Sequence, residues 1–265
     1  MPLGIPLASM SGCGSIFANG YEEAVSAASR DKGKSLMAEI PTIELAGATV
    51  DQAGLDRLLA AGAPRRLVGA ELGGLTFGEV DLGGWRFENC NLGHCRLVRT
   101  RLADSRWSAC KAAFADFGRA DLVDAEIVAS DFNNALFRQA ILTSTTFRRS
   151  KLTGADFTDA RTVDLGLEEV LAVDARLPKV SFRDRTLTRV DLSGALLEGA
   201  DFRGVVFEDC SLRDAQLMRA RFEGADLRGA DLGGIRLGDA AHFRGAVISR
   251  AQATSLLKEL GLRVL

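Results

Sequence analysis

The chain has 265 residues, 47% of them hydrophobic, and a formal net charge of −2. This apolar content is enough to bury a large core, and a single elongated domain is expected. The near-neutral charge suggests neither a polyanionic nor a polycationic protein, and no apolar run approaches the ~20 residues that span a bilayer. We therefore expect no membrane partner, no secretory signal peptide and a cytoplasmic location.

The segment 1–40 differs from the rest of the chain in being rich in Met, Gly, Ser and Ala. It shows no periodic placement of apolar residues, and we expect a flexible leader. Residues 28–35 match a relaxed phosphate-loop pattern that ends in Gly33, Lys34 and Ser35. Such a loop needs a strand before it and a helix after it, whereas no strand precedes this one and Pro41 soon follows. We predict no nucleotide site.

Residues 41–64 have the pattern of a cap on the segment that follows. Ile43 and Leu45 alternate with polar neighbours, as in a short strand. Thr49 to Gln52 matches a helix capping box, and apolar residues at helical spacing continue up to Gly62. We expect a short strand and then a helix that covers the first turn of the next segment.

From residue 67 to residue 237, a large apolar residue recurs at every fifth position, except at Ala112, Thr162 and Ala172. The position two residues after it is mostly Gly, Asp or Asn, which tolerate a positive φ and form corners. The position two residues before it is mostly small. This small column includes Ala70, Cys90, Cys95, Ser105, Cys110, Ala115, Ala120, Ala125, Ala155, Ala200, Cys210, Ala225 and Ala230.

A period of five excludes regular helices and long strands. An α-helix turns about 100° per residue, so steps of five would scatter the large residues around its axis. Each quintet instead predicts a very short extended piece followed by a turn. Repetition of this unit is typical of a solenoid in which each turn pairs with the next at about 4.8 Å.

The individual quintets also resemble a known repeat. Examples are Ala-Asp-Phe-Thr-Asp at 155–159, Ala-Asp-Phe-Arg-Gly at 200–204 and Ala-Asp-Leu-Arg-Gly at 225–229. They resemble the A(D/N)LXX motif of the pentapeptide-repeat family, and the resemblance covers roughly residues 65–245. It implies an all-β solenoid, a right-handed quadrilateral β-helix with four quintets per coil and small helical caps at both ends. The rod would be about 40 Å long at one strand spacing per coil.

We divide the repeats into a first block, 65–160, and a second block, 181–245, because the pattern weakens at 161–180. Leu167 and Val170 have helical spacing there, Asp164 is a candidate N-cap, and Pro178 follows. The Phe column also moves by one face, between Phe157 and Phe182. We therefore predict that 161–180 leaves the coil as a loop or short helix.

The carboxylates of this predicted excursion are our candidate partner-binding residues: Asp164, Glu168, Glu169 and Asp174. In the second block, Arg185 stands where a small inward residue is expected, and the sequence offers no reason for it.

The pattern of residues 246–265 predicts an amphipathic helix that ends at a Gly, followed by a short apolar strand. This ending resembles the C-terminal helical module of the quinolone-resistance pentapeptide proteins, which mediates their dimerisation, although similar tails also serve as plain caps. Both alternatives remain open, and the residues concerned are Leu256, Leu257, Leu260 and Val264.

The residue types that catalysis needs are scarce or regularly repeated. His94 and His242 are the only histidines, and neither has a partner at triad or ligand spacing. Cys90 and Cys110 are one coil apart, within disulfide range in principle, but buried free thiols are expected. The Asp residues recur directly before the large apolar residue, at outward positions, as in a ladder of charges along a solvated face. We predict a non-enzymatic protein with no catalytic, cofactor or metal site.

Two classes of function remain open. The family resemblance implies protection or inhibition of DNA gyrase or topoisomerase IV by a dimeric rod that imitates duplex DNA and binds no nucleic acid itself. A DNA mimic should be acidic, but acidic and basic residues are interleaved here, with a basic cluster at Arg138, Arg148, Arg149 and Lys151. The alternative is a binding scaffold, either an effector exported through a type III apparatus by its 1–40 leader or a cytoplasmic protein-interaction rod.

Overall fold

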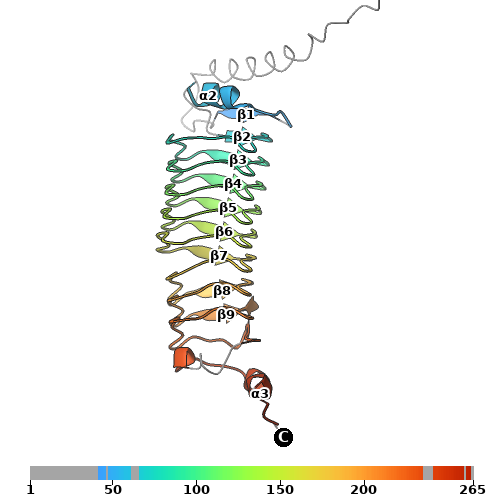
Figure 1. Ribbon diagram of the computed structural model, residues 1–265, viewed down its shortest axis with the longest axis vertical. Helices are drawn as coiled ribbons and strands as arrows, with labels where there is room; N and C mark the ends of the chain where they lie inside the picture. The colour runs from blue at the N-terminus through green and yellow to red at the C-terminus, as the bar shows by residue number, and fades with distance from the viewer. Residues whose placement is uncertain (1–40, 46, 61–65, 235–240, 260, 264–265) are drawn as a thin grey trace, which may run out of the picture.

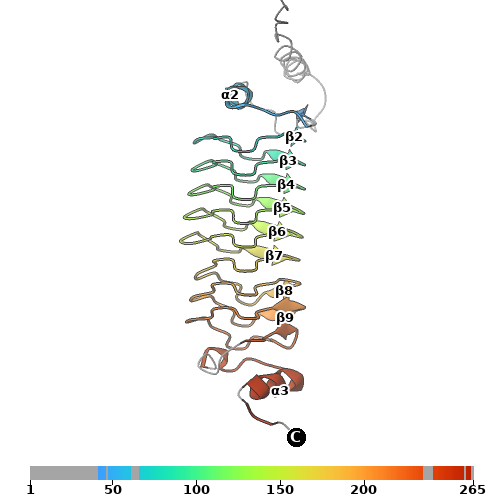
Figure 2. The same ribbon diagram turned by 45° about the vertical axis from the view of Figure 1, so that its right-hand side comes forward.

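The repeat region is a parallel β-solenoid with one small helix at each end (Figures 1 and 2). The computed structural model describes residues 41–45, 47–60, 66–234, 241–259 and 261–263. The predicted leader 1–40 lies outside the described residues. This architecture confirms the predicted solenoid fold.

One sheet runs along the rod. Its nine strands are parallel and follow chain order, and partners from β2 onward are 20 residues apart, as for Leu67, Phe87 and Trp107. Four quintets therefore make one coil. The strands are β1 (Thr42–Glu44), β2 (Arg66–Val68), β3 (Arg86–Glu88), β4 (Arg106–Ser108), β5 (Glu126–Val128), β6 (Thr146–Arg148), β7 (Gly166–Glu168), β8 (Thr186–Thr188) and β9 (Val206–Glu208). A second pair, β10 (Cys210–Ser211) and β11 (Ala230–Asp231), lies near the C-terminal end.

Each coil has four faces, which we name by the quintets of the first coil. The strand face contains 66–70, the second face 71–75, the third face 76–80 and the fourth face 81–85, each with its equivalents at steps of 20. On the last three faces, single backbone bridges replace strands, such as Asp81 with Arg101 and Arg101 with Asp121. The outward Asp and Arg ladders predicted from the sequence are these bridge positions.

The corners have left-handed backbone conformations. At nearly all corners the residue two after the large one has a positive φ, near +50° to +60° where it is not Gly, even for the bulky Phe114 and Arg119. On the second, third and fourth faces a backbone bond across the turn, such as Ala125 N–H to Leu122 C=O at 3.0 Å, closes most corners. A positive φ disfavours such side chains, so the stack of neighbouring coils must hold these corners in place.

The core consists of the two predicted inward columns. Large residues such as Leu122 and small ones such as Ala125 are fully buried. Aromatic rings stack along the axis: Phe117, Phe137 and Phe157 have ring centroids 5.1 and 4.8 Å apart. The four cysteines of the small column, which are also buried, are free: Cys90, Cys95, Cys110 and Cys210.

The excursion predicted for 161–180 is wrong, because the coil continues through it. Leu165, Leu167 and Val170 are buried in the two inward columns, so their apparent helical spacing is the pentapeptide pattern itself. Asp164 is a left-handed corner with φ 58° and not a helix N-cap. The Phe column changes face without an insertion, and in the quintet 161–165 the buried Leu165 occupies the small column while Thr162 occupies the large column.

The N-terminal cap consists of β1 and α2 (Gln52–Ala60), and its helix begins differently from the prediction. Asp51 caps α2 by accepting the Gly54 N–H at 2.7 Å, whereas Thr49 forms a bridge with Glu71. The predicted capping box is therefore absent. The Gln52 side chain instead bonds both the N–H and the C=O of Thr76 in the first coil, which ties the helix to the coil end.

The C-terminal cap begins with a last partial coil. Phe243 stacks on Phe222 at 4.6 Å, and Val247 bridges Asp226. Helix α3 (Arg250–Glu259) follows, with a true capping box in which Ser249 and Gln252 exchange two hydrogen bonds. The predicted Gly stop is confirmed, because Gly261 has φ 76° and donates to Lys258 C=O.

We expect Phe137→Ala to lower the free energy of unfolding by about 3–5 kcal/mol, because it leaves a cavity between two stacked rings. Phe114→Ala is the matched control, since Phe114 is 53% exposed at a corner. Chemical denaturation followed by circular dichroism measures both. Equal losses of stability in the two variants would contradict the assignment of the Phe137 column to the core.

We expect Asp156→Asn to destabilise the rod by about 1–3 kcal/mol at pH 7, because Asp156 accepts charge-assisted bonds. Burial raises its pKa, but bonds from Thr158 and Arg138 outweigh this and hold the pKa below its usual value. The stabilisation is present above the unfolded pKa of about 3.9 and is lost as the pH falls through the folded value.

The cost of Asp156→Asn should therefore shrink in urea titrations as the pH is lowered below about 4. Asp159→Asn, at an exposed corner of the same quintet, serves as the control and should change little at any pH. A cost that stays constant down to pH 2 would mean that Asp156 does not act through its charge.

Candidate partner-binding surface

Many outward charges are neutralised within the rod itself. Arg66 pairs with Glu88 and Arg99 with Glu79, each at 2.8 Å and each across to a neighbouring coil. Other pairs lie within one quintet: bidentate bonding to Arg228 lowers the pKa of Asp226 to about 2. Paired charges of this kind offer little net field to a partner.

The four carboxylates assigned to the predicted excursion do not form one site. Three of them are in ion pairs: Asp164 with Arg185, Glu168 with Arg148, and Glu169 with Arg189. They also lie on different faces, because Asp164 ends a fourth-face quintet, the two Glu residues lie on the strand face, and Asp174 lies on the second face. Of the four, only Asp174 is exposed without a cationic partner in the described part of the chain.

Within the described residues, several carboxylates along the rod form no ion pair, among them Asp104, Asp116 and Asp131, and one group of them gathers toward the C-terminal end. This group lies on the strand face and the second face of three successive coils, with Asp174 and Asp214 at the far corner of the second face. We call it the acidic patch: Asp174, Asp191, Glu208, Asp209 and Asp214. Within the described residues none of the five forms an ion pair. Glu208 accepts a hydrogen bond from Thr188, and Asp191 accepts hydrogen bonds from Ser193.

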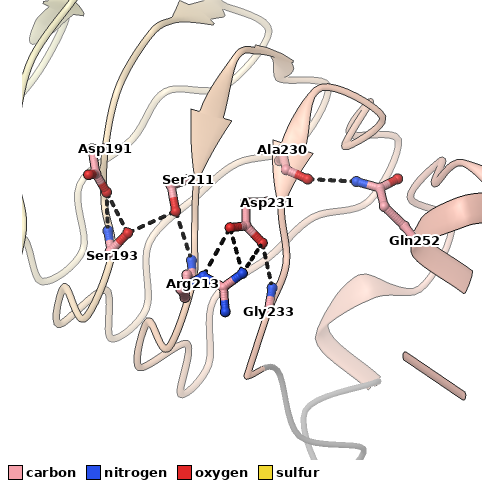
Figure 3. Close-up of polar contacts among 8 residues, drawn as sticks. All are labelled: Asp191, Ser193, Ser211, Arg213, Ala230, Asp231, Gly233 and Gln252. Carbon is pink, nitrogen blue, oxygen red and sulfur yellow. Dashed lines mark hydrogen bonds and ion pairs between the residues drawn. The ribbon is translucent and has the colours of Figure 1, made fainter. Parts of the chain in front are cut away.

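The neighbouring cations are already engaged, as Figure 3 shows. Arg213 binds both carboxylate oxygens of Asp231, which also accepts the Gly233 N–H at 3.0 Å. The hydroxyl groups of Ser193 and Ser211 are hydrogen-bonded to each other at 2.8 Å. On these three coils the second face thus presents hydroxyls and carboxylates, with Lys151 on the same face one coil nearer the N-terminus and Arg189, which pairs with Glu169, close to Asp209.

A cleft of about 300 Å³ separates this face from α3. Arg213, Asp231 and Gly233 line one side, and Ser255 and Leu256 line the other. The Gln252 side chain closes its inner end by donating to Leu227 C=O and Ala230 C=O, at 2.6 and 2.7 Å. Arg213, Asp231, Gly233 and Gln252 thus already have partners within the protein.

The C-terminal end carries exposed apolar side chains. Leu257 is 40% and Leu262 is 53% exposed, close in sequence to the exposed Val247 and Ile248. Leu256 is half-buried against the cleft. Leu260 and Val264, which were also predicted to cap or dimerise, lie outside the described residues.

The histidines and cysteines are placed for packing. His94 stacks in parallel on Phe114, with ring centroids 5.0 Å apart. Burial raises the pKa of the Cys95 thiol to about 11 and also raises that of Cys210, so neither forms a thiolate at neutral pH. In the described ranges, no three His, Cys, Asp or Glu side chains gather as a metal site would require.

The sequence predicted neither the acidic patch nor the hydrogen bonds by which the Gln252 side chain joins α3 to the last coils. The carboxylates of the patch follow the general Asp pattern of the repeat, so the sequence gives no sign that their cations pair elsewhere. The Ser249–Gln252 capping box was detectable from its spacing. In the part of the chain that the structure covers, neither helix has the length and apolarity of a transmembrane segment.

Comparisons with known proteins agree with the architecture. The family model for pentapeptide repeats matches residues 120–159, 173–204, 186–224, 195–234 and 220–255. No curated protein matches the sequence. Among solved structures, trypsin-treated QnrB1, a plasmid-mediated fluoroquinolone resistance protein, is 22% identical with a TM-score of 0.65 and covers 76% of this chain and 100% of its own.

Full-length QnrB1 is 21% identical, with a TM-score of 0.58, and the alignment covers 74% of this chain and all of QnrB1. At this identity the likeness concerns the fold alone. The repeat motif, the register of 20 residues and the two inward columns all lead to the same assignment: the chain is a pentapeptide-repeat protein.

Proposed function

We propose that this protein is a rigid protein-binding rod that protects or inhibits a type II topoisomerase, DNA gyrase or topoisomerase IV, without itself contacting nucleic acid. The observation that carries the proposal is the acidic patch. Its five carboxylates gather on three successive coils, and within the described residues none of them forms an ion pair. A basic groove that normally holds DNA phosphates would accept such a surface.

The fold supports the same proposal. QnrB1 confers fluoroquinolone resistance according to its name, and the present chain aligns with its full length. The contact would be short, since it is formed by the patch alone. At a coil spacing of about 4.8 Å, the patch has a length on the order of 10–15 Å along the axis. We expect the interaction to be weakened by salt, since it rests on exposed charges.

A second candidate is a cytoplasmic interaction scaffold with a partner that is not a topoisomerase. Ion pairs across neighbouring coils favour it, because they remove charge from surfaces that a DNA mimic would keep acidic. The supercoiling experiment below separates the two candidates.

We expect the full chain at micromolar concentration to alter gyrase supercoiling, or to relieve its block by a gyrase poison. The double substitution Asp209→Asn and Asp214→Asn should raise the protein concentration needed for half the effect by about tenfold, because rim charges steer the encounter. Both residues are left-handed corners, where Asn is tolerated, so stability should not change.

The matched control is Asp104→Asn with Asp124→Asn, two left-handed corners on the fourth face. This control should behave as the parent protein does. No effect of the parent protein on gyrase or topoisomerase IV would remove the topoisomerase proposal and leave the scaffold. Equal losses in both double variants would show that the acidic patch is not the contact.

We also propose that the apolar C-terminal end joins two copies of the chain. Light scattering of the parent protein should then give the mass of a dimer, and Leu257→Glu should give a monomer because it buries a charge in the interface. Met218→Glu is the control, since Met218 is 60% exposed on the third face. A monomeric parent protein would leave α3 as a plain cap.

A further inference from the structure

In the described part of the rod, a run of five successive bonds is missing from the backbone hydrogen-bond ladder at one place. One coil nearer the N-terminus, five bonds join the region 139–145 to the region 158–166. They run from the N–H groups of Gln139, Arg161, Leu142, Ser144 and Gly166 to the C=O groups of Thr158, Ala140, Arg161, Val163 and Thr145. The five equivalent bonds are also present one coil below the break, starting with Lys179 N–H to Glu198 C=O.

Between residues 159–167 and 178–187, none of these five bonds forms. The N–H groups left without their ladder partners in this described stretch are those of Asp159, Thr162, Asp164, Ser181 and Thr186. The sheet weakens at the same level. Strands β7 and β8 pair at Glu168 and Thr188 alone, whereas the other neighbours in this sheet pair at three positions. We call this break the seam.

The seam opens one side of the rod only. On the opposite side the same two coils remain bonded, through Phe157 N–H to Arg176 C=O at 2.9 Å and Gly154 N–H to Val173 C=O at 2.9 Å. Beyond the strand face, the ladder resumes with Glu169 N–H to Thr188 C=O at 2.9 Å. Figures 1 and 2 show β8 set apart from β7, whereas the other strands follow one another more evenly.

Arg185 occupies the seam. Its Nη1 donates to Leu165 C=O at 3.4 Å and to Asp164 C=O at 3.5 Å, and its Nη2 pairs with the Asp164 carboxylate. Leu165 C=O is the acceptor that Thr186 N–H would use in a regular coil. In the coils on either side this inward column holds uncharged side chains, with Leu165 and Val205 as the direct neighbours of Arg185 and Ser105, Ala125, Thr145 and Ala225 further away.

A guanidinium cannot enter the apolar core without a large desolvation cost. Arg185 therefore turns outward between the coils, and its side chain is 37% exposed. It then holds the carbonyls of the upper coil away from the amides of the lower one. Val163 and Ser181, which lie at the two edges of the seam, are exposed.

We propose that the seam is a hinge at which the rod bends about its bonded side, and that Arg185 is the wedge that keeps it open. The two segments on either side have regular ladders and move as rigid pieces. Bending changes the curvature of the fourth face and of the strand face without unfolding a coil. A rod with such a hinge adapts its curved surface to a partner.

Amide hydrogen exchange of the full chain tests the wedge. In the parent protein, the amides of Thr162, Asp164, Ser181 and Thr186 should exchange faster than those of Leu142 and Ser144 one coil above. Arg185→Ala should slow them by about tenfold or more, because ladder closure raises the free energy of local opening. The control Arg183→Ala removes an arginine that pairs only with its neighbour Asp184 and should change nothing.

Distance measurements between spin labels test the hinge. The pair Ser144→Cys and Asp184→Cys spans the seam, and the pair Asp104→Cys and Ser144→Cys covers two coils of the same corner column above it. Cys13 is replaced by Ser, and the other native cysteines are buried. The spanning pair should give the broader distribution, and Arg185→Ala should narrow it.

Equal widths for the two label pairs would overturn the hinge and leave a fixed opening. Equally slow exchange at the seam and in the coil above would overturn the seam itself. Fast exchange that persists in Arg185→Ala would show that another residue holds the coils apart and would refute the wedge.

Discussion

The stacking of large apolar side chains upon one another, once per coil of 20 residues, is the interaction on which the rest of this rod depends. Each coil alone has no second layer to cover its core, so it buries Phe137 or Leu122 only between its neighbours. This stack also holds the corners in a left-handed conformation that residues such as Phe114 and Arg119 would not adopt by themselves. Loss of one coil therefore affects both of its neighbours, as in other repeat proteins.

Because the interior is filled by packing, recognition is left to the outward positions. Many outward charges pair across or within coils, whereas the five carboxylates of the acidic patch gather on successive coils without forming ion pairs in the described region. The two ends need separate solutions, since an open coil exposes both core and backbone. A glutamine performs the same task at each end: Gln52 bonds Thr76, and Gln252 bonds Leu227 and Ala230.

The seam shows how a single inward position affects a whole level of the stack. Arg185 cannot be buried, and its guanidinium takes the acceptors that would close the ladder. The opposite side stays bonded, and its inward side chains Ala172 and Ala175 are fully buried and uncharged. The regular repeat thus makes the rod rigid. The interruption in its described part, the seam, lies where Arg185 departs from that repeat.

The sequence by itself determined the solenoid, its inward columns, its corners and the presence of a cap at each end, because these follow from side-chain size and turn preference within a few residues. It could not decide the path of 161–180, where Thr162 occupies the large column and the buried Leu165 the small column. Nor could it locate the acidic patch or explain Arg185. Those features depend on which residues meet across coils, about 20 positions apart, and only the stacked tertiary structure sets these contacts.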